Sequence, residues 1–492
     1  MKTLATPTLL IDTRGGTSLS LSAWAQAVRQ AMKAGDRLIT LFGRPEDGNV
    51  VVTAVLQSSA GLAALRARGT AGERFPSLTL EFPAAQIAER ELWEQTGLVP
   101  DGHPWLKPVR FEGDRQRRMV EYPFFLFRGA EVHEVGVGPI HASVIEPGHF
   151  RFMCHGERVQ HLEIQLGYQH RGVESLLLRR PPLALTSLIE SISGDTSVAY
   201  AWGYCAAVEA LADVDVGLVT ELVRGVALEM ERVAMHLVTL AGMATDIAFL
   251  QGGATYGRLR TAIINATMRV CGSRFGRGWL RPGGVRSPIT LAQCDDLLAT
   301  LGTFAKDLQK VNGLMRASRS VRSRLQGTGV LGQQAARELG MVGVVAKASG
   351  LFADVRRDLP GRLFDKEPVE ILTEDDGDCW ARMSVRMREI DESVRWLTRV
   401  LHTHGAQLSV PPPERLRSLA PHALCITMCE GFRGPVMQAV ETDADGALLH
   451  YKIRDPSMPN WFGLALALRG NEISDFPICN KSFDLSYCGN DL

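Results

Sequence analysis

The sequence predicts an α+β N-terminal domain followed by a mainly α domain with a small β lead-in. Over residues 1–128, short runs of β-branched and aromatic residues alternate with helical stretches, as in a small α+β domain. Two extended segments follow residue 135, and beyond residue 184 apolar residues recur mainly at three- and four-residue steps, the period of a helix. We therefore assign residues 1–128 to the first domain and residues 135–492 to the second.

The first domain is predicted to combine short strands with helices. Runs at residues 37–42, 50–55 and 77–82 are typical of strands, and residues 23–33 are typical of a helix. A second, charged helix starts near residue 89 and ends at Gly97, since glycine readily adopts the conformation that ends a helix.

The second domain is predicted to begin with a β-hairpin and to continue as helices. Residues 149–153 and 159–166 are extended, with Gly156 at the turn between them. Apolar residues repeat with helical spacing over residues 218–240 and 383–401, which predicts two helices with one buried face each. Three consecutive prolines at residues 411–413 end the helical region.

The composition is that of a globular protein that binds no nucleic acid. Lys+Arg and Asp+Glu both number 54, so no net charge attracts the chain to a polyanion. No apolar stretch approaches the roughly 20 residues of a membrane-spanning helix. An apolar run near the N-terminus is interrupted before it forms a secretory segment, so a cytoplasmic location is expected.

The nine cysteines show no spacing typical of a disulfide framework, and most are expected to be reduced core residues. Cys425 and Cys429 form the one close pair, and on a helix they would share a face that suits a metal ion. Without a second pair nearby, the interpretation as core residues is favoured over a metal site.

Short motifs follow one another in a fixed order from about residue 85 to the end of the chain. The first comprises residues 89–94 (ERELWE), Gly97 and residues 101–104 (DGHP). The others are residues 138–141 (GPIH), 146–151 (EPGHFR), 168–174 (YQHRGVE), 229–232 (EMER) with His236, 281–284 (RPGG), 347–350 (KASG) with Asp354 and Arg356, 430–434 (EGFRG) and 468–471 (LRGN).

The first motif resembles the small hydrophilic subunit of respiratory complex I, which is often fused to its larger neighbour. The later motifs resemble that larger neighbour, the quinone-site subunit of complex I, and the large subunit of membrane-bound group 4 nickel-iron hydrogenases. The chain is thereby identified as a fused member of this superfamily. The resemblance implies that the second domain has the fold of a nickel-iron hydrogenase large subunit.

The resemblance also locates four positions at which hydrogenases carry metal-binding cysteines. These positions, here called the degenerate site, hold Ser193, Thr196, Ser486 and Gly489. Soft thiolates stabilise nickel and bridge it to iron, and none of these residues replaces a thiolate. Cys488 is next to one position but out of register. We therefore expect no metal on this chain and no hydrogenase activity, and we expect the two loops to meet in space around a polar pocket. Hydroxyls, Asp195 or Asp484, and Arg356 are expected to line this pocket and to need water or a ligand as hydrogen-bond partners.

Complex I uses a tyrosine and a histidine to hold the quinone headgroup, and both positions differ here. The tyrosine position corresponds to Gly194, and the histidine position falls near Pro147. Quinone remains a possible ligand of the chain, because other histidines and tyrosines lie near these positions in the sequence, namely His141, His149, Tyr200 and Tyr487.

Further residues occupy motif positions that the family uses around its buried cavity and proton route. The charged candidates are Arg171, Glu174, Glu231, Arg232, Asp354, Arg356, Arg433 and Asp484. Buried charges need partners, so these residues form either a proton relay or structural ion pairs, and both alternatives stay open. For His141, His149 and His170, a hydrogen-bonded structural role is favoured over a redox role.

Two functions follow from the resemblance. In the first, the protein is an oxidoreductase subunit, of the NADH:quinone oxidoreductase or hydrogenase type, that passes electrons to quinone or another acceptor and couples this to ion translocation. In the second, it is a non-catalytic structural or coupling subunit. Both imply iron-sulfur clusters in a small partner subunit, since this chain has no cysteine run to carry one. Both also imply membrane antiporter-like and complex I-like partners, and a peripheral place on the cytoplasmic face of the inner membrane.

Overall fold

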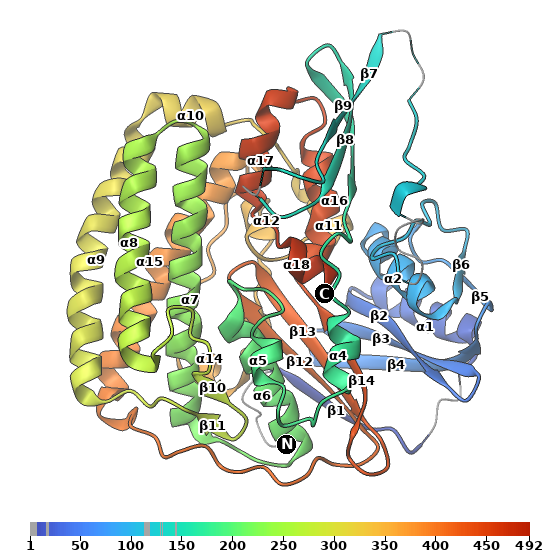
Figure 1. Ribbon diagram of the computed structural model, residues 1–492, viewed down its shortest axis with the longest axis horizontal. Coiled ribbons are helices and arrows are strands. Elements are labelled where there is room, and N and C mark those ends of the chain that lie inside the picture. The colour runs from blue at the N-terminus through green and yellow to red at the C-terminus, as the bar shows by residue number, and fades with distance from the viewer. Residues whose placement is uncertain (1–6, 16–18, 113–118, 128, 130, 143–144) are drawn as a thin grey trace.

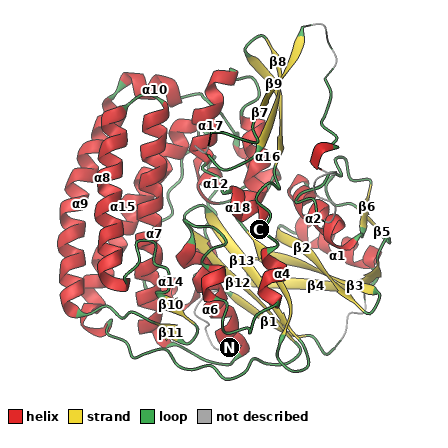
Figure 2. Ribbon diagram, in the orientation of Figure 1, coloured by secondary structure: helices red, strands yellow, loops and turns green. Residues whose placement is uncertain are grey.

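The computed structural model describes the chain except for residues 1–6, 16–18, 113–118, 128, 130 and 143–144. Both limits of the predicted first domain, residues 1 and 128, lie outside the described residues. The small N-terminal domain packs beside a central sheet, and the long helices stand on the other side of that sheet (Figures 1 and 2).

The N-terminal domain is a three-stranded antiparallel sheet with two helices on one face. The strands β2 (Arg37–Glu46), β3 (Asn49–Ser58) and β4 (Gly61–Thr70) pair in that order. Helix α1 (Leu21–Lys33) packs on β4 and helix α2 (Gln86–Thr96) on β2. As predicted, α2 ends at Gly97 with a left-handed conformation (φ 76°). A parallel pair, β5 (Arg74–Pro76) and β6 (Val99–Asp101), and the short η1 (Pro83–Ala85) complete the domain.

The strand predicted at residues 77–82 is wrong. These residues form a turn, in which Glu81 and Phe82 donate backbone hydrogen bonds to the Leu78 carbonyl at 3.1 and 2.8 Å. The buried carboxylate of Glu89 holds the turn, because it accepts hydrogen bonds from the backbone N–H of Leu78 and from the Ser77 and Thr79 hydroxyls. A local side-chain acceptor therefore competes with strand pairing.

A four-stranded antiparallel sheet occupies the centre of the molecule and was not predicted. Its order is β1 (Thr8–Asp12), β12 (Ala423–Gly431), β13 (Gly434–Thr442) and β14 (Leu448–Arg454). Every residue of β12 and β13 is buried, so neither strand shows the apolar-polar alternation by which strands are recognised. The N-terminal sheet packs face to face on this sheet through Ile39, Phe42, Val55, Ile426 and Met437.

The close cysteine pair lies on β12, not on a helix. Both thiols are fully buried, and burial raises the pKa of Cys425 to about 12 and raises that of Cys429 further. Protonated thiols are poor metal ligands. The structure therefore agrees with the interpretation of Cys425 and Cys429 as core residues.

The helical body is built on five long helices, α6 (Ser197–Leu211), α7 (Gly217–Asp246), α8 (Leu250–Cys271), α9 (Leu291–Ala317) and α15 (Cys379–His404). Helix α6 lies on the central sheet, and α7 contacts α8, α15 and α17 (Phe476–Phe483). Because α7 is surrounded, residues 220–237 are all buried, and the prediction of a single buried face is wrong for this helix. No helix among the described residues is long and apolar enough to span a membrane.

Shorter elements connect these layers. The predicted hairpin is present as β8 (His149–His155) and β9 (Arg158–Gln165), and β7 (Val132–Val137) adds a third strand (Figure 1). The predicted start of the second domain, residue 135, lies within β7. The others are α4 (Val173–Leu178), α5 (Thr186–Ile189), β10 (Leu280–Arg281), β11 (Gly284–Val285), α10 (Arg319–Leu325), α11 (Gln333–Glu338), α12 (Gly343–Ala348), α13 (Val355–Asp358), α14 (Gly361–Lys366), η2 (Gly405–Gln407), α16 (Ser457–Ala467), η3 (Ile473–Asp475) and α18 (Tyr487–Asp491).

A buried carboxylate on β13 ties the N-terminal domain to the central sheet. Glu441 accepts a hydrogen bond from Arg44 Nε at 3.0 Å and another from Arg66 Nη2 at 2.7 Å. Its side chain is only 3% exposed, so each guanidinium relies on this carboxylate rather than on water.

We predict that Glu441→Gln destabilises the protein by roughly 3–5 kcal/mol, because it removes the buried counter-charge of Arg66 and leaves Arg44 paired with Glu46 alone. The measurement is urea-induced unfolding. Glu46→Gln is the matched control: Glu46 also pairs with Arg44 but is half-buried, so its loss costs less than about 1 kcal/mol. Equal effects of the two substitutions would show that Glu441 does not hold the domains together.

Candidate functional site

The four positions of the degenerate site come together from opposite ends of the second domain. Ser193 lies in the α5–α6 connection, Ser486 is the residue before α18, and their hydroxyl oxygens are 3.1 Å apart although the residues are 293 positions apart in the chain. The Thr196 hydroxyl donates to Ser193 Oγ at 3.5 Å. The predicted meeting of the two loops is confirmed.

The first loop is held by an acidic side chain from a neighbouring helix. Glu231 on α7 accepts hydrogen bonds from the backbone N–H groups of Val198 at 2.6 Å and Ala199 at 3.2 Å, in the first turn of α6. These N–H groups have no partner within their own helix. Glu231 therefore fixes the loop that precedes α6.

The second loop is held by hydroxyl groups. Ser486 caps α18 by accepting a hydrogen bond from the Gly489 N–H at 2.9 Å, and its own N–H donates to Ser457 Oγ at 2.9 Å. Arg171 joins the two loops, because its guanidinium donates to the carbonyls of Ser191, Ile192 and Cys488 at 2.9, 2.7 and 3.2 Å.

An ion pair lies at the middle of the degenerate site. Arg433 donates two hydrogen bonds of 2.7 Å to the two carboxylate oxygens of Asp195, and Asp484 is 3.8 Å from the same guanidinium. The hydroxyls of Ser193 and Thr196 donate to Asp195 Oδ1 at 2.9 and 3.0 Å. Burial disfavours the Asp195 carboxylate, but Arg433 outweighs this and lowers its pKa.

The polar groups of the degenerate site thus satisfy one another. This corrects the expectation that they need a ligand or water to complete their hydrogen bonds. Arg356, which was also expected here, lies elsewhere, where it pairs with Asp354 at 2.8 Å and with Glu229 at 3.1 Å.

A nickel-iron centre does not fit these residues. A Cβ atom at Gly489 would lie 2.3 Å from Asp455 Oδ2, so the fourth ligand position has no room for a cysteine side chain. Asp455 is itself fixed, since it accepts hydrogen bonds from the Tyr200 hydroxyl at 2.6 Å and the Ser457 N–H at 2.7 Å. Burial raises the pKa of the neighbouring Cys488 to about 11, which keeps that thiol protonated.

Of the possible quinone contacts, His141 and Tyr487 both lie next to Gly148. The His141 Nε2 atom is 2.8 Å from the Gly148 carbonyl oxygen, and a Cβ atom at Gly148 would lie 2.8 Å from Tyr487 Cε1. His149 instead bonds through Nδ1 to the Gly138 carbonyl at 3.1 Å. Tyr200 is fully buried and holds Asp455.

Two other candidate residues, His170 and Glu174, form contacts outside the degenerate site. His170 Nδ1 is 2.7 Å from the Asp491 carbonyl, a contact that holds the C-terminal helix. Glu174 pairs with Lys452 at 3.1 Å and accepts a hydrogen bond from the Ile453 N–H at 2.9 Å. Despite burial, Lys452 and Arg110 lower the pKa of Glu174 to about 2. Glu174 therefore belongs to the contact between the two domains.

Most of the remaining charged candidates form one buried charge network. Lys347 donates to Asp354 and Glu389 at 2.6 Å each, and Glu389 in turn contacts His236 Nε2 at 2.7 Å. Arg356 and Arg232 both pair with Glu229, at 3.1 and 3.0 Å. The sequence reasoning missed Glu229, Lys347, Glu389 and Glu430 as site residues, although all but Glu389 lie inside the quoted motifs.

Two carboxyl groups beside this network titrate near neutral pH. Burial, together with the Asp354 charge, raises the pKa of Glu430 to about 7 against the opposing effect of Lys347. Burial raises the pKa of Glu231 to about 8. Burial also lowers the pKa of His236 to about 4, although Glu389 opposes this.

The network and the degenerate site share the turn between β12 and β13. Arg232 donates to the carbonyls of Glu430 and Gly431 at 2.6 and 3.0 Å, while Arg433, two residues further on, holds Asp195. The turn therefore joins the buried charges directly to the degenerate site.

Family comparisons match both domains. A model described as the 30 Kd subunit of respiratory-chain NADH dehydrogenase matches residues 18–123, and a model described as its 49 Kd subunit matches residues 246–412. The order of the two matches is that of a fused chain.

Similar proteins include both hydrogenase and quinone oxidoreductase subunits. Formate hydrogenlyase subunit 5 of Escherichia coli (strain K12) is 28% identical over 492 aligned residues, covering 93% of this chain and 85% of the relative. Hydrogenase-4 component G of the same organism is 28% identical, covering 85% and 76%. The C/D subunit of NADH-quinone oxidoreductase from Gluconacetobacter diazotrophicus is 26% identical, covering 84% and 78%.

We predict that Gly489→Ala destabilises the protein by about 1–3 kcal/mol, because the added methyl group meets the fixed Asp455 carboxylate. Gly194→Ala is the matched control in the other loop: there the nearest heavy atom is Arg277 Nη2 at 3.5 Å, an ordinary contact. Thermal unfolding of both variants measures the difference. A Gly489→Ala variant as stable as the control would mean that the fourth position is open to a side chain.

Proposed function

Because the chain belongs to the superfamily of fused complex I-type subunits and their group 4 hydrogenase relatives, we propose that it is a coupling subunit without nickel-iron chemistry. One observation carries the proposal: the degenerate site is filled by the Asp195–Arg433 ion pair, and Asp455 blocks its fourth position. In hydrogenases the two loops bind a metal, whereas in this chain they are joined by direct hydrogen bonds such as that between Ser193 and Ser486.

The buried charge network supports a role in ion coupling. A group changes protonation readily when its pKa is near the ambient pH, and Glu430, at about 7, meets this condition. Glu430 Oε1 is 3.9 Å from Lys347, and Glu430 lies one residue before the turn that Arg232 and Arg433 hold. A displacement of this turn would change the surroundings of Glu430 and so its affinity for a proton.

The partners follow from the same family membership. Electrons would come from a small iron-sulfur subunit, and the ions would move through antiporter-like membrane subunits beside complex I-like ones. The chain would then bind peripherally to these subunits on the cytoplasmic face of the inner membrane.

Quinone reduction is the second candidate function, and the placement of His141 and Tyr487 next to Gly148 favours it. Two electrons from the iron-sulfur partner and two protons would convert a quinone to a quinol. Burial raises the pKa of Tyr487 to about 12, so its phenol keeps its proton at neutral pH and is able to donate a hydrogen bond.

We predict that the native complex contains this chain together with iron-sulfur and membrane subunits, but no stoichiometric nickel on this chain and no hydrogen uptake. The reason is the Ser193, Thr196, Ser486 and Gly489 set, which offers no thiolate. The measurements are purification of the detergent-solubilised complex, elemental analysis and a hydrogen-uptake assay. Stoichiometric nickel with hydrogen uptake would refute the metal-free function, and a chain recovered alone would refute the coupling function.

A second prediction separates the two candidate functions in that complex. Glu430→Gln imitates the protonated carboxyl group and still offers an oxygen to the Val355 N–H, which lies 3.0 Å from Glu430. We expect it to keep electron transfer but to lose most ion translocation in proteoliposomes, whereas the exposed control Glu338→Gln changes neither. If Tyr487→Phe abolishes quinone reduction, the chain is catalytic; unaltered ion translocation in Glu430→Gln excludes the coupling role.

A further inference from the structure

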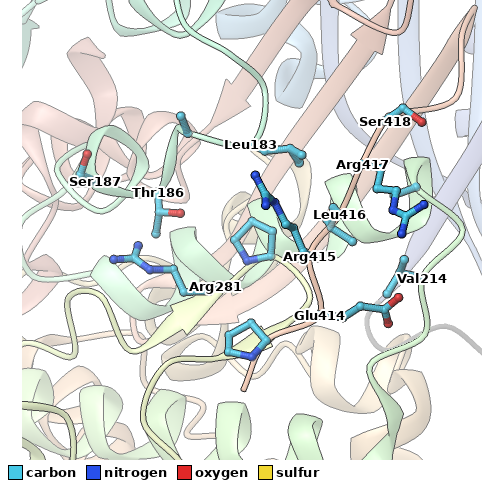
Figure 3. Close-up of a pocket in the computed structure, with 14 residues that line it drawn as sticks. Leu183, Thr186, Ser187, Val214, Arg281, Glu414, Arg415, Leu416, Arg417 and Ser418 are labelled. Carbon is cyan, nitrogen blue, oxygen red and sulfur yellow. The ribbon is translucent and has the colours of Figure 1, made fainter. Parts of the chain in front are cut away.

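A broad groove of about 1550 Å³ opens between four segments of the second domain, away from all the candidate site residues. It is lined by residues 183–187 before and within α5, the loop after α6, β10 and the extended chain that follows the three prolines (Figure 3). Three guanidiniums, those of Arg281, Arg415 and Arg417, line the groove and Glu414 is its one acidic lining residue.

The three arginines are spread across this arginine groove. In the view of Figure 3, Arg281 lies on the left, Arg417 on the right and Arg415 between them. None of the three forms an ion pair or a side-chain hydrogen bond with any residue that the structure describes, although the charge of Arg281 partly opposes the burial that raises the pKa of Glu190. Elsewhere in the chain, buried arginines such as Arg224 and Arg356 form ion pairs with carboxylates.

The backbone along the groove is also unused. Glu414 donates its N–H to the Gly283 carbonyl at 2.9 Å, and Ala420 donates to the Leu211 carbonyl at 2.7 Å. Between them, residues 415–419 form no backbone-to-backbone hydrogen bond with any other described part of the chain. This stretch belongs to no helix or strand, and its residues Arg415, Arg417 and Ser418 are exposed, so a second extended chain can pair with their backbone.

We propose that the arginine groove binds an extended acidic segment of a partner subunit. Arginine pairs with carboxylates through two parallel hydrogen bonds, and three separated guanidiniums match carboxylates spaced along a peptide better than one compact anion. The volume also exceeds the roughly 300–1000 Å³ of small-molecule pockets. Leu183, Val214 and Pro413 provide apolar contacts for the aliphatic parts of such a segment.

The inference goes beyond the coupling function, because no residue of the degenerate site or the charge network lines the groove. Only one part of the inference rests on the proposed function, namely that the acidic segment belongs to another subunit of the same complex. The interaction itself is a property of this chain and is measurable with a synthetic peptide.

The test measures binding of a fluorescent oligoglutamate peptide to the full chain by anisotropy. We expect saturable binding that weakens roughly tenfold or more in the double variant Arg415→Gln/Arg417→Gln, since two charge-assisted hydrogen-bonding groups are lost. The control Arg316→Gln/Arg319→Gln removes the same charge from exposed positions near α10 and should bind as the parent does. On binding, the backbone amides of residues 415–419 should become protected from hydrogen exchange.

Three results would overturn the proposal. Equal weakening in both double variants would mean general attraction to a polyanion. Equal binding of an uncharged oligoglutamine peptide would mean that the arginines do not select the ligand. Displacement of the peptide by inorganic phosphate at matched ionic strength, without displacement by chloride, would assign the groove to a small anion.

Discussion

Arg433 is the charge on which the arrangement around the degenerate site depends. Its guanidinium donates two hydrogen bonds to Asp195, donates a third to the Asp484 carbonyl and lies over the Phe432 ring. The α5–α6 loop, the β12–β13 turn and the loop before α18 meet at this one side chain. A buried ion pair is stable only when its remaining donors and acceptors are also satisfied, and the Ser193 and Thr196 hydroxyls provide that satisfaction.

This arrangement keeps the two loops together without any thiolate at the four positions of the degenerate site. A nickel-iron centre needs soft thiolate ligands and an open coordination position, and an ion pair surrounded by hydroxyls provides neither. The β12–β13 turn, which carries Arg433, also contacts the buried charge network. Arg232 holds the carbonyls of Glu430 and Gly431, so a shift at the degenerate site would reach the buried charge network through covalently adjacent residues. That continuity supports the proposed coupling function over metal catalysis.

Local signals in the sequence predicted local structure, while contacts set by tertiary packing were missed. Helix α1, the Gly97 end of α2 and the β8–β9 hairpin follow from periodicity and turn residues. The central sheet does not, because β12 and β13 are buried on both faces and β1 pairs with a strand near the opposite end of the chain. The motifs likewise located the two loops of the degenerate site, since four ligands of one metal must lie together, but no pattern showed that Arg433 would pair with Asp195. Glu389 was missed because it lies on an amphipathic helix, where a charge usually faces water.

Several charged side chains in the interior of this chain are paired, whereas the arginines of the groove are not, a difference that the total charge does not show. Lys+Arg and Asp+Glu are equal at 54 each, which by itself suggests no charged partner. Inside, Lys347, Arg356 and Arg433 have carboxylate partners, because an unpaired charge in a buried site would shift its protonation or destabilise the fold. On the outside, Arg281, Arg415 and Arg417 face a groove where water makes unpaired charges inexpensive, so no folding requirement explains their grouping. A partner that supplies the missing carboxylates does explain it.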